Sequence, residues 1–293
     1  WSSDVCSSDL GKVDDGNTTT DFDPEEIKRR TSISAALAPC DWKDIRINLI
    51  DAPGYFDFVG ELVASLNVSD AAVIAVDSVS GVEVGTEKAW DIVEEKRLPC
   101  LFFINKMDRE NANFSKVMTQ LREVFGNKLV PMQVPIGAES NFKGVIDLID
   151  MKARTLEGNK IVEGDIPSDY EVDVEEFRND IIEAAAQSDE ELMEKYFSGE
   201  ELTKDEIIKG LRIGVINNDV VPILCGSALN NIGIDTIMNA IERLFPSPMD
   251  IEGYEVKNLK TDEVENRKYD SSLPFSAHVF KTEIGRASCR ERV

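Results

Sequence analysis

Four short apolar segments, each closed by a polar residue, constrain the fold of this chain more than any other feature. Continuous apolar runs of this length are typical of strands that are covered on both faces. The stretches between them have helical spacing, as in the segment from Asn113 that carries apolar side chains at i, i+3 and i+4 and stops at Gly126. Strands and helices in alternation predict an α/β fold with a parallel sheet. The segments are Arg46–Asp51 (RINLID), Ala71–Asp77 (AAVIAVD), Leu98–Asn105 (LPCLFFIN) and Val220–Ser227 (VVPILCGS).

The composition changes between about residue 128 and residue 219, before the last apolar segment. Residues 144–167 have the pattern of short strands, and acidic helices are predicted near 174–187, 189–197 and 203–216. We therefore predict an α+β subdomain over about 128–219, inserted into a domain that spans residues 11–248.

The segment over residues 249–283 is predicted to be a linker followed by the start of a second domain. The sequence LFPSP ends a helix with two prolines, which cannot continue it. Leu273–Thr282 (LPFSAHVFKT) then predicts the first strand of a β-rich domain.

The composition excludes several classes of protein. A net charge of −24 over 293 residues argues against a broad basic face for nucleic acid, and most of the carboxylates are expected to form a solvated surface. No run approaches the ~18 apolar residues that a membrane span needs. The five cysteines show no CxxC spacing, which predicts neither a zinc site nor disulfides. We expect a cytoplasmic monomer that binds neither membrane nor DNA.

The two ends of the chain follow no strand or helix pattern. Residues 1–10 (WSSDVCSSDL) and 284–293 (IGRASCRERV) match translations of common short-read sequencing adapters over their full lengths. The codons GC TCT TCC GAT CT, which encode the end of the first segment, are the reverse complement of AG ATC GGA AGA GC, which encodes the start of the second. We therefore expect both ends to be adapter-derived, with the natural segment running from Gly11 to Thr282; natural, poorly ordered tails are the alternative.

The motif DAPG (Asp51–Gly54) follows the first predicted strand and is the first of three motifs with chemical meaning. An acid at a strand terminus can hold Mg²⁺ through its water shell, so Asp51 is a candidate metal and nucleotide residue. Gly54 lets a backbone N–H approach a γ-phosphate without a side chain in the way. Alone, the tetrapeptide is also compatible with an ordinary turn.

The motif NKMD (Asn105–Asp108) follows the third predicted strand and offers selective recognition of guanine. Asp108 can accept from guanine N1–H and from the exocyclic amine together, a pair of donors that adenine lacks. Asn105 is expected to brace the neighbouring loops, and Lys106 to lay its stem along the base.

The motif CGSA (Cys225–Ala228) ends the last predicted strand. The backbone N–H groups of Ser227 and Ala228 are expected to receive guanine O6 there. Each motif alone is a weak signal, but the three in this order and spacing predict a GTP site.

From Gly11 to Thr282 the chain resembles elongation factor G, especially a side branch of elongation factor G-like proteins whose first motif reads PGYFDF. The resemblance implies a GTPase fold of the phosphate-loop type with the inserted subdomain, a β-barrel second domain from about Leu273, and three further domains. It implies a GTP-hydrolysing translation factor, with GTP or GDP and Mg²⁺ as cofactors and the ribosome, through rRNA and stalk proteins, as partner. The matching segments are DAPGYFDFVGEL, PCLFFINKMDRENANF, VPIGAESNFKGVIDLIDMKA, ELMEKYFSGEELT, VPILCGSALNNIG and LFPSP.

The resemblance assigns roles to two further residues. Thr31–Ile33 (TSI) aligns with the family's first switch motif and places Ser32 where a threonine normally ligates Mg²⁺; a solvated serine is the alternative. Tyr55 stands where the wider family has a histidine that orients the attacking water. Tyrosine has a reference pKa near ~10 and no pair of ring nitrogens, so hydrolysis is expected to be slower or to depend more on the ribosome, unless Tyr55 is a packing residue.

The sequence contains no G-x-x-x-x-G-K-[ST], the phosphate loop that supplies most of the binding to β- and γ-phosphates. We expect that loop, with the first core strand and helix, roughly thirty to fifty residues upstream of Gly11. The chain itself is then expected to bind GTP weakly or not at all. The alternatives are a ribosomal protection GTPase that confers tetracycline resistance, a release-factor GTPase, and a ribosome-docking module with weak or no GTPase activity.

Overall fold

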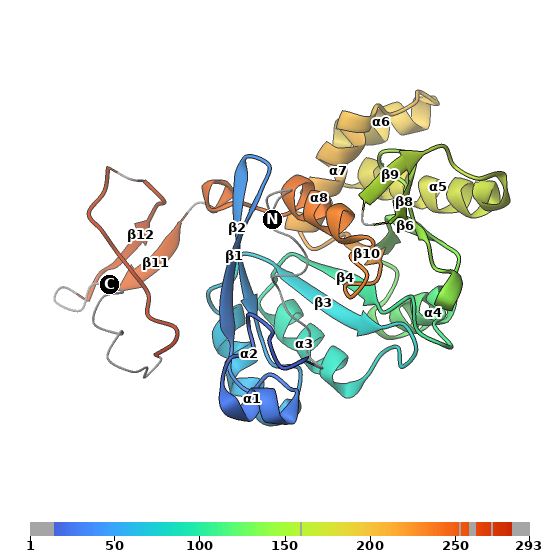
Figure 1. Cartoon of the computed structure of the whole chain (residues 1–293). Helices are drawn as coiled ribbons and strands as arrows, with labels where there is room; N and C mark the ends of the chain where they lie inside the picture. Colours follow the sequence, from blue (N-terminus) through green and yellow to red (C-terminus); the bar gives the residue numbers. More distant parts are fainter. Residues whose placement is uncertain (1–14, 159, 252, 258–261, 271, 283–293) are drawn as a thin grey trace.

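A parallel sheet of four strands forms the centre of the fold (Figure 1). The computed structural model describes residues 15–158, 160–251, 253–257, 262–270 and 272–282, so the predicted adapter-derived ends lie outside the described residues. Three of the four apolar segments are confirmed as parallel strands of this sheet. The strand order is β3 (Ala72–Asp77), β4 (Cys100–Asn105), β10 (Val221–Cys225) and β5 (Leu129–Pro131).

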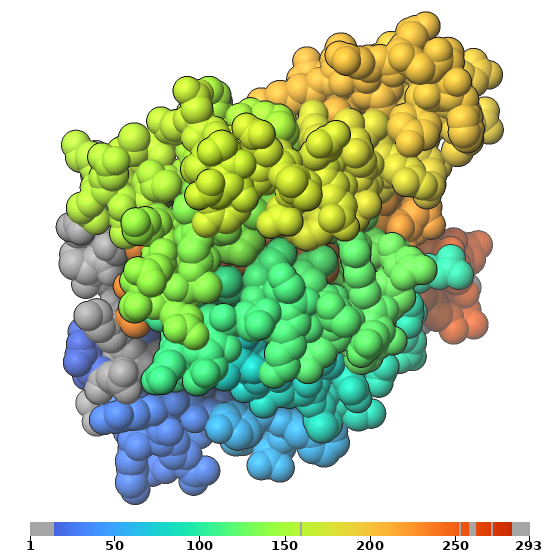
Figure 2. Space-filling view, turned by 90° about the vertical axis from the view of Figure 1, so that its right-hand side faces the viewer, coloured from blue at the N-terminus to red at the C-terminus, as the bar shows by residue number. Residues whose placement is uncertain are grey.

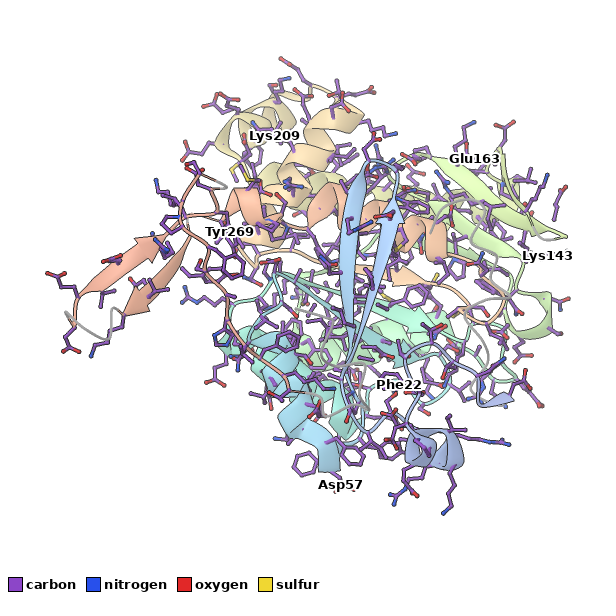
Figure 3. The ribbon with its side chains drawn as sticks, turned by 60° about the vertical axis from the view of Figure 1, so that its left-hand side comes forward. Phe22, Asp57, Lys143, Glu163, Lys209 and Tyr269 are labelled. Atoms are coloured by element: carbon purple, nitrogen blue, oxygen red, sulfur yellow. The ribbon has the colours of Figure 1, made fainter. Side chains whose placement is uncertain are left out.

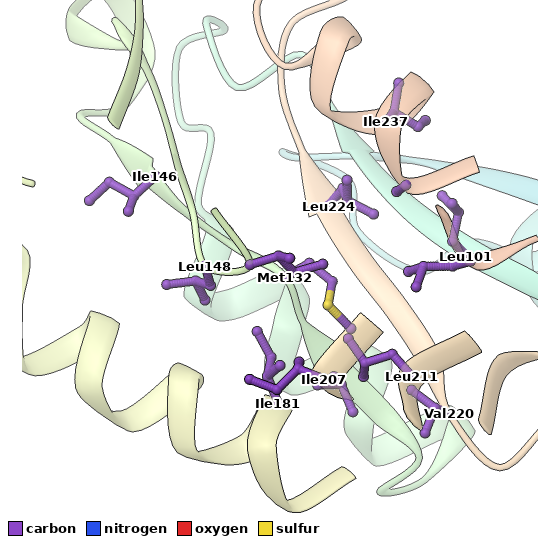
Figure 4. Packing of buried hydrophobic residues seen from close by; sticks show 14 of the residues in the cluster. Leu101, Met132, Ile146, Leu148, Ile181, Ile207, Leu211, Val220, Leu224 and Ile237 are labelled. Atoms are coloured by element: carbon purple, nitrogen blue, oxygen red, sulfur yellow. The ribbon is translucent and has the colours of Figure 1, made fainter. Parts of the chain in front are cut away.

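Both faces of this sheet are covered at β4 and β10, whereas alternate residues of β3 remain exposed. Successive side chains of β4 point to opposite faces: Leu101 and Phe103 belong to one buried cluster, and Phe102 and Ile104 to the other. Helices α3 (Val84–Glu95) and α4 (Phe114–Phe125) supply the cluster around Phe102. The other cluster, shown in Figure 4, is filled from α5 (Glu171–Gln187), α7 (Lys204–Ile216) and α8 (Ile234–Leu244).

Helix α4 begins and ends where the sequence predicts. The side chain of Asn113 accepts a hydrogen bond from the backbone N–H of Lys116 at 2.9 Å and caps the first turn. Gly126 follows the last turn with φ of 89°, a conformation that favours glycine. The predicted helix is therefore confirmed at both ends.

The insert is a second, antiparallel sheet backed by helices. The predicted short strands and the three acidic helices are confirmed, with α6 (Glu190–Ser198) between α5 and α7. The insert starts slightly later than predicted, because β5 pairs with β10 and keeps the chain in the parallel sheet as far as Pro131. Figure 2 shows the insert as a continuous yellow-green and yellow layer, with α6 protruding at its outer end. Its strands are β6 (Gln133–Ile136), β7 (Gly144–Asp147), β8 (Lys152–Glu157) and β9 (Lys160–Gly164).

The first apolar segment is not a core strand, and that prediction is wrong. Strand β2 (Ile45–Asp51) pairs antiparallel with β1 (Ala36–Trp42) and, among the described residues, with no strand of the parallel sheet. Its side chains stay partly exposed because, among the described residues, β1 is its only strand partner. The tip of this two-stranded ribbon contacts α8, where the Trp42 indole N–H donates to Asn239 Oδ1 at 3.2 Å.

The segment Leu273–Thr282, predicted to be the first strand of a β-rich domain, also differs from the prediction. Residues 273–282 form no strand, and the side chains of Phe275 and Val279 are 92% and 78% exposed, since no neighbouring strand in the described chain covers them. A hairpin of β11 (Tyr254–Lys257) and β12 (Val264–Arg267) precedes this segment instead and stands apart from the rest in Figure 1. Its strands are four residues each, too short for a clear sequence pattern.

Two short helices complete the fold, α1 (Pro24–Arg29) and α2 (Val59–Leu66). Within the described residues, every helix is too short or too polar to cross a membrane.

Candidate guanine-nucleotide site

The carboxyl ends of β3, β4 and β10 lie at one edge of the parallel sheet. Asp77, the last residue of β3, is the register partner of Asn105, the last residue of β4. On the other side of β4, Cys225 of β10 is the register partner of Ile104. The NKMD and CGSA motifs are therefore neighbours, as ligand sites at the ends of parallel strands require.

Backbone hydrogen bonds join the two motifs into one unit. Gly226 N–H donates to Ile104 O at 3.0 Å, and Met107 N–H donates to Gly226 O at 3.1 Å. A Cβ on Gly226 would lie 2.3 Å from Ile232 O and 2.9 Å from the Phe103 ring. Glycine is therefore needed here, between β4 and the turn that contains Ile232.

The Asn105 side chain adds a third connection between the loops. Its Oδ1 accepts from Ala228 N–H at 3.0 Å and from Lys106 N–H at 2.7 Å. Lys106 adopts a φ of 64°, in the left-handed region that a lysine rarely occupies. Asn105 therefore links the backbone of Lys106 to that of Ala228.

Asp108, the predicted guanine acceptor, has one side-chain oxygen that is unsatisfied within the described chain. Its Oδ1 is buried and has no hydrogen-bond partner among the described residues. Buried carboxylate oxygens are almost always satisfied, because an unpaired one retains its full desolvation cost. An external donor, such as the N1–H and exocyclic amine of guanine, fits this unsatisfied acceptor.

The amides predicted to receive guanine O6 have protein partners in this structure. Ser227 N–H donates to Ile232 O at 2.9 Å and the residue is fully buried, while Ala228 N–H is the donor to Asn105. The expected O6 contact is therefore absent from the described geometry. No sequence pattern indicates these partners, because they depend on the conformation of the turn before Ile232.

Asp77 belongs to this edge, although we did not predict it. Its Oδ2 lies 2.9 Å from Lys106 Nζ and 3.4 Å from Arg109 Nη1, and its Oδ1 accepts from Val79 N–H at 2.9 Å and from Ser80 N–H at 3.2 Å. Burial acts to raise the pKa of Asp77, but Lys106 and these amides lower it below its ordinary value. A polar residue that closes an apolar strand was the available signal.

The two predicted metal residues lie near the same carboxylate, Asp21. Ser32 Oγ donates to Asp21 Oδ1 at 2.7 Å. Loss of water around Asp51 raises the pKa of its carboxyl group; the Thr20 hydroxyl opposes that rise, and the charges of Asp21 and Glu26 add to it. Negative charge gathered in this way would be relieved by a cation. Within the described chain, however, no three acidic, histidine or cysteine residues are arranged as a metal site.

The segment around Ser32 is held by two glutamates that we did not predict. Glu26 Oε1 accepts from Ile33 N–H at 2.9 Å and from Ser34 N–H at 3.0 Å. Glu61 Oε2 accepts from Ala35 N–H at 2.8 Å. No local sequence pattern indicates these contacts, because Glu61 is 26 residues away along the chain.

Tyr55 lies at the surface, at the start of a short turn over Phe56–Phe58. Its side chain is 63% exposed, which argues against the packing alternative. Gly54 has no atoms within 4 Å of the position that a Cβ would take, so this side of the residue is open. Figure 3 shows Asp57 of this turn at the end of the molecule opposite to Lys209 of the insert.

Comparison with known proteins identifies the family. The family described as the elongation factor Tu GTP binding domain matches residues 5–247. Elongation factor G of Thermotoga maritima and that of Thermotoga sp. strain RQ2 are each 40% identical over 278 residues, covering 94% of this chain and 40% of the relative. A crystal structure of a Thermus thermophilus protein aligns with a TM-score of 0.79 and 33% identity, over 84% of this chain and 37% of that chain.

The chain thus spans 40% of the length of the curated relatives. The family match covers residues 5–247. This range includes the hydrogen-bonded loops at the ends of β4 and β10. This chain belongs to the elongation factor Tu GTP-binding domain family, as an elongation factor G-like member.

Proposed function

We propose that the chain is the guanine-nucleotide-binding part of a translation factor that hydrolyses GTP on the ribosome. The observation that carries this proposal is the buried, unsatisfied Oδ1 of Asp108 beside two loops joined through Asn105. The relatives named elongation factor G support the ribosome as the partner.

Each residue of the site has a distinct part in this function. Asp108 accepts from guanine, Asn105 fixes the loops, and the Lys106 stem lies along the base; Ala228 is placed to reach O6 if its amide exchanges partners. Gly54 would offer its backbone to the γ-phosphate, and Asp51 and Ser32 are the residues that would hold Mg²⁺. Bound Mg²⁺ would neutralise phosphate charge. Tyr55 orients the attacking water.

The intact gene product, meaning this chain with whatever coding sequence flanks it in the genome, is expected to hydrolyse GTP faster when ribosomes are added. The reason is that an exposed Tyr55 needs a partner to hold it against the water. Phosphate release is measured with and without ribosomes, and Tyr55→Phe, which keeps the ring and loses the hydroxyl group, is the matched variant. Ribosome association without stimulated hydrolysis would favour the docking-module alternative.

The chain as it stands is expected to bind a fluorescent GTP analogue only weakly, with a dissociation constant above ~1 μM. It has no phosphate loop, and the lysine and amides of that loop contribute most of the phosphate binding. Fluorescence titration of the chain, with the intact gene product as the positive control, measures this. Submicromolar affinity for the chain alone would contradict the expectation.

We further infer that the intact gene product works in the cytoplasm as a monomer. Its expected contacts are rRNA and the ribosomal stalk proteins, with no binding to DNA or membrane.

A further inference from the structure

The ion pair between Asp77 and Lys106 lies at the edge of the candidate base site. Asp77 ends β3 and its side chain is 15% exposed, whereas that of Lys106 is 48% exposed. The carboxylate is thus fixed by the sheet, and the lysine is the mobile partner. Because the two charges are 2.9 Å apart, the ammonium group is drawn toward the end of β3.

The two oxygens of Asp77 have separate contacts. Oδ1 accepts the amides of Val79 and Ser80 and so shapes the loop after β3. Oδ2 contacts only side chains in the described structure, Lys106 at 2.9 Å and Arg109 at 3.4 Å. The loop contacts and the ion pair can therefore be separated by a substitution that alters one oxygen.

The backbone of Lys106 is held from the same side. Ser78, which is fully buried, donates its hydroxyl to Lys106 O at 2.8 Å. Ser78 N–H donates to Asn105 O at 3.0 Å. With these bonds, the loop after β3 holds both the left-handed backbone of Lys106 and its ammonium group.

We propose that Asp77 is a positioning residue for guanine-nucleotide binding, which acts by holding the Lys106 stem as one wall of the base site. This inference rests on the proposed function. A free lysine stem loses conformational freedom when it packs on a ligand, and that loss weakens binding. The ion pair removes most of this freedom before the nucleotide arrives, so the nucleotide leaves more slowly.

The test is the dissociation rate of a fluorescent GDP analogue from the intact gene product. Asp77→Asn keeps an Oδ1 acceptor for the loop amides and replaces the charged Oδ2 by an amide. Its rate is expected to rise roughly 3- to 10-fold, the range for one newly mobile side chain. Lys106→Met keeps an apolar stem but removes the ammonium group, and should reproduce the rise without altering Asp77.

A double substitution shows whether Asp77 acts through Lys106. In a Lys106→Ala background, Asp77→Asn is expected to change the dissociation rate by less than about 2-fold, because the lysine stem is already absent. Asp180→Asn is the control, since it breaks another 2.9 Å ion pair, with Arg122, away from these loops. Thermal melting of each variant reports on folding.

The outcomes are distinguishable. The inference is overturned if Asp77→Asn and Lys106→Met both leave the rate unchanged, or if Asp77→Asn has its full effect in the Lys106→Ala background. If the unmodified protein does not retain the GDP analogue at all, both the proposed function and this inference fail.

Discussion

Replacing Asp108 with alanine is expected to lower the affinity of the intact gene product for GTP by about 10²- to 10⁴-fold, the loss of two hydrogen bonds to a charged group. Affinity for ATP should hardly change, since adenine offers no matching pair of donors. The preference for guanine would then largely disappear. The stability of the protein should be retained, because the buried Asp108 Oδ1 has no protein partner to lose.

Competition between a fluorescent GTP analogue and unlabelled GTP, ATP or xanthosine triphosphate measures this preference. Asp108→Asn is the matched variant, because it keeps the shape and turns one acceptor into a donor. It should favour xanthosine nucleotides, whose ring carries an oxygen where guanine has an amine. An Asp108→Ala protein that still selects GTP over ATP would show that Asp108 does not recognise the base.

Replacing Arg154 with methionine is expected to lower the free energy of unfolding by roughly 3–5 kcal/mol, as for other buried ion pairs that lose one partner. Arg154 is 12% exposed and lies 2.9 Å from Asp150, 3.0 Å from Glu163 and 3.0 Å from Asp235. These carboxylates come from the turn after β7, from β9 and from α8. Removing the arginine leaves negative charges facing one another where the insert meets the core helix.

Urea unfolding followed by circular dichroism measures this loss. Lys152→Met is the control, because it breaks a pair with the fully exposed Asp165 and should cost less than ~1 kcal/mol. The loss for Arg154→Met should shrink as the pH falls. Burial raises the pKa of Asp147, and the charge of Arg154 opposes that rise. Without the arginine, the Asp147 carboxyl group is protonated at a higher pH. A protonated carboxyl group carries no charge and needs no ion-pair partner. Equal losses for the two variants would contradict the expectation.

Asp150 behaves in the opposite way to Asp147, three residues earlier. Burial acts to raise its pKa, but hydrogen bonds from Lys204 and Arg243 hold the pKa at about 2. Its folded pKa is thus below its unfolded value, so this carboxylate stabilises the fold above the ordinary pKa of ~4, and the contribution is lost as the pH falls toward 2.

Strands β4 and β10 were predictable because strands buried on both faces are apolar along their length. The segment Arg46–Asp51 has three polar residues among its six, and its prediction as a core strand is wrong because a short run does not specify which strand it pairs with. The hairpin of β11 and β12 was not predicted because strands of four residues are too short to give a reliable pattern.

In the candidate site too, residues with a local sequence pattern were predicted and those without one were not. Polar residues directly after apolar strands located Asn105 and Asp108, and the same rule applied to Asp77 would have found it. Other hydrogen bonds could not be predicted. They are those of the Ser227 and Ala228 amides and the one from Ala35 N–H to Glu61. Such contacts are set by tertiary packing, so composition and spacing do not indicate them.

The strand order of the central sheet has a consequence for how the protein is made. Strand β10 lies between β4 and β5, yet residues 132–220 are synthesised before it. Synthesis runs at about 5–20 residues per second, so roughly 4–18 s pass before β10 is made. During this time the edges of β4 and β5 that face β10 are unpaired. During that interval the insert can already fold on its own antiparallel sheet. A chaperone that shields apolar edges of nascent chains would therefore have its main opportunity here, before Val221–Cys225 closes the gap.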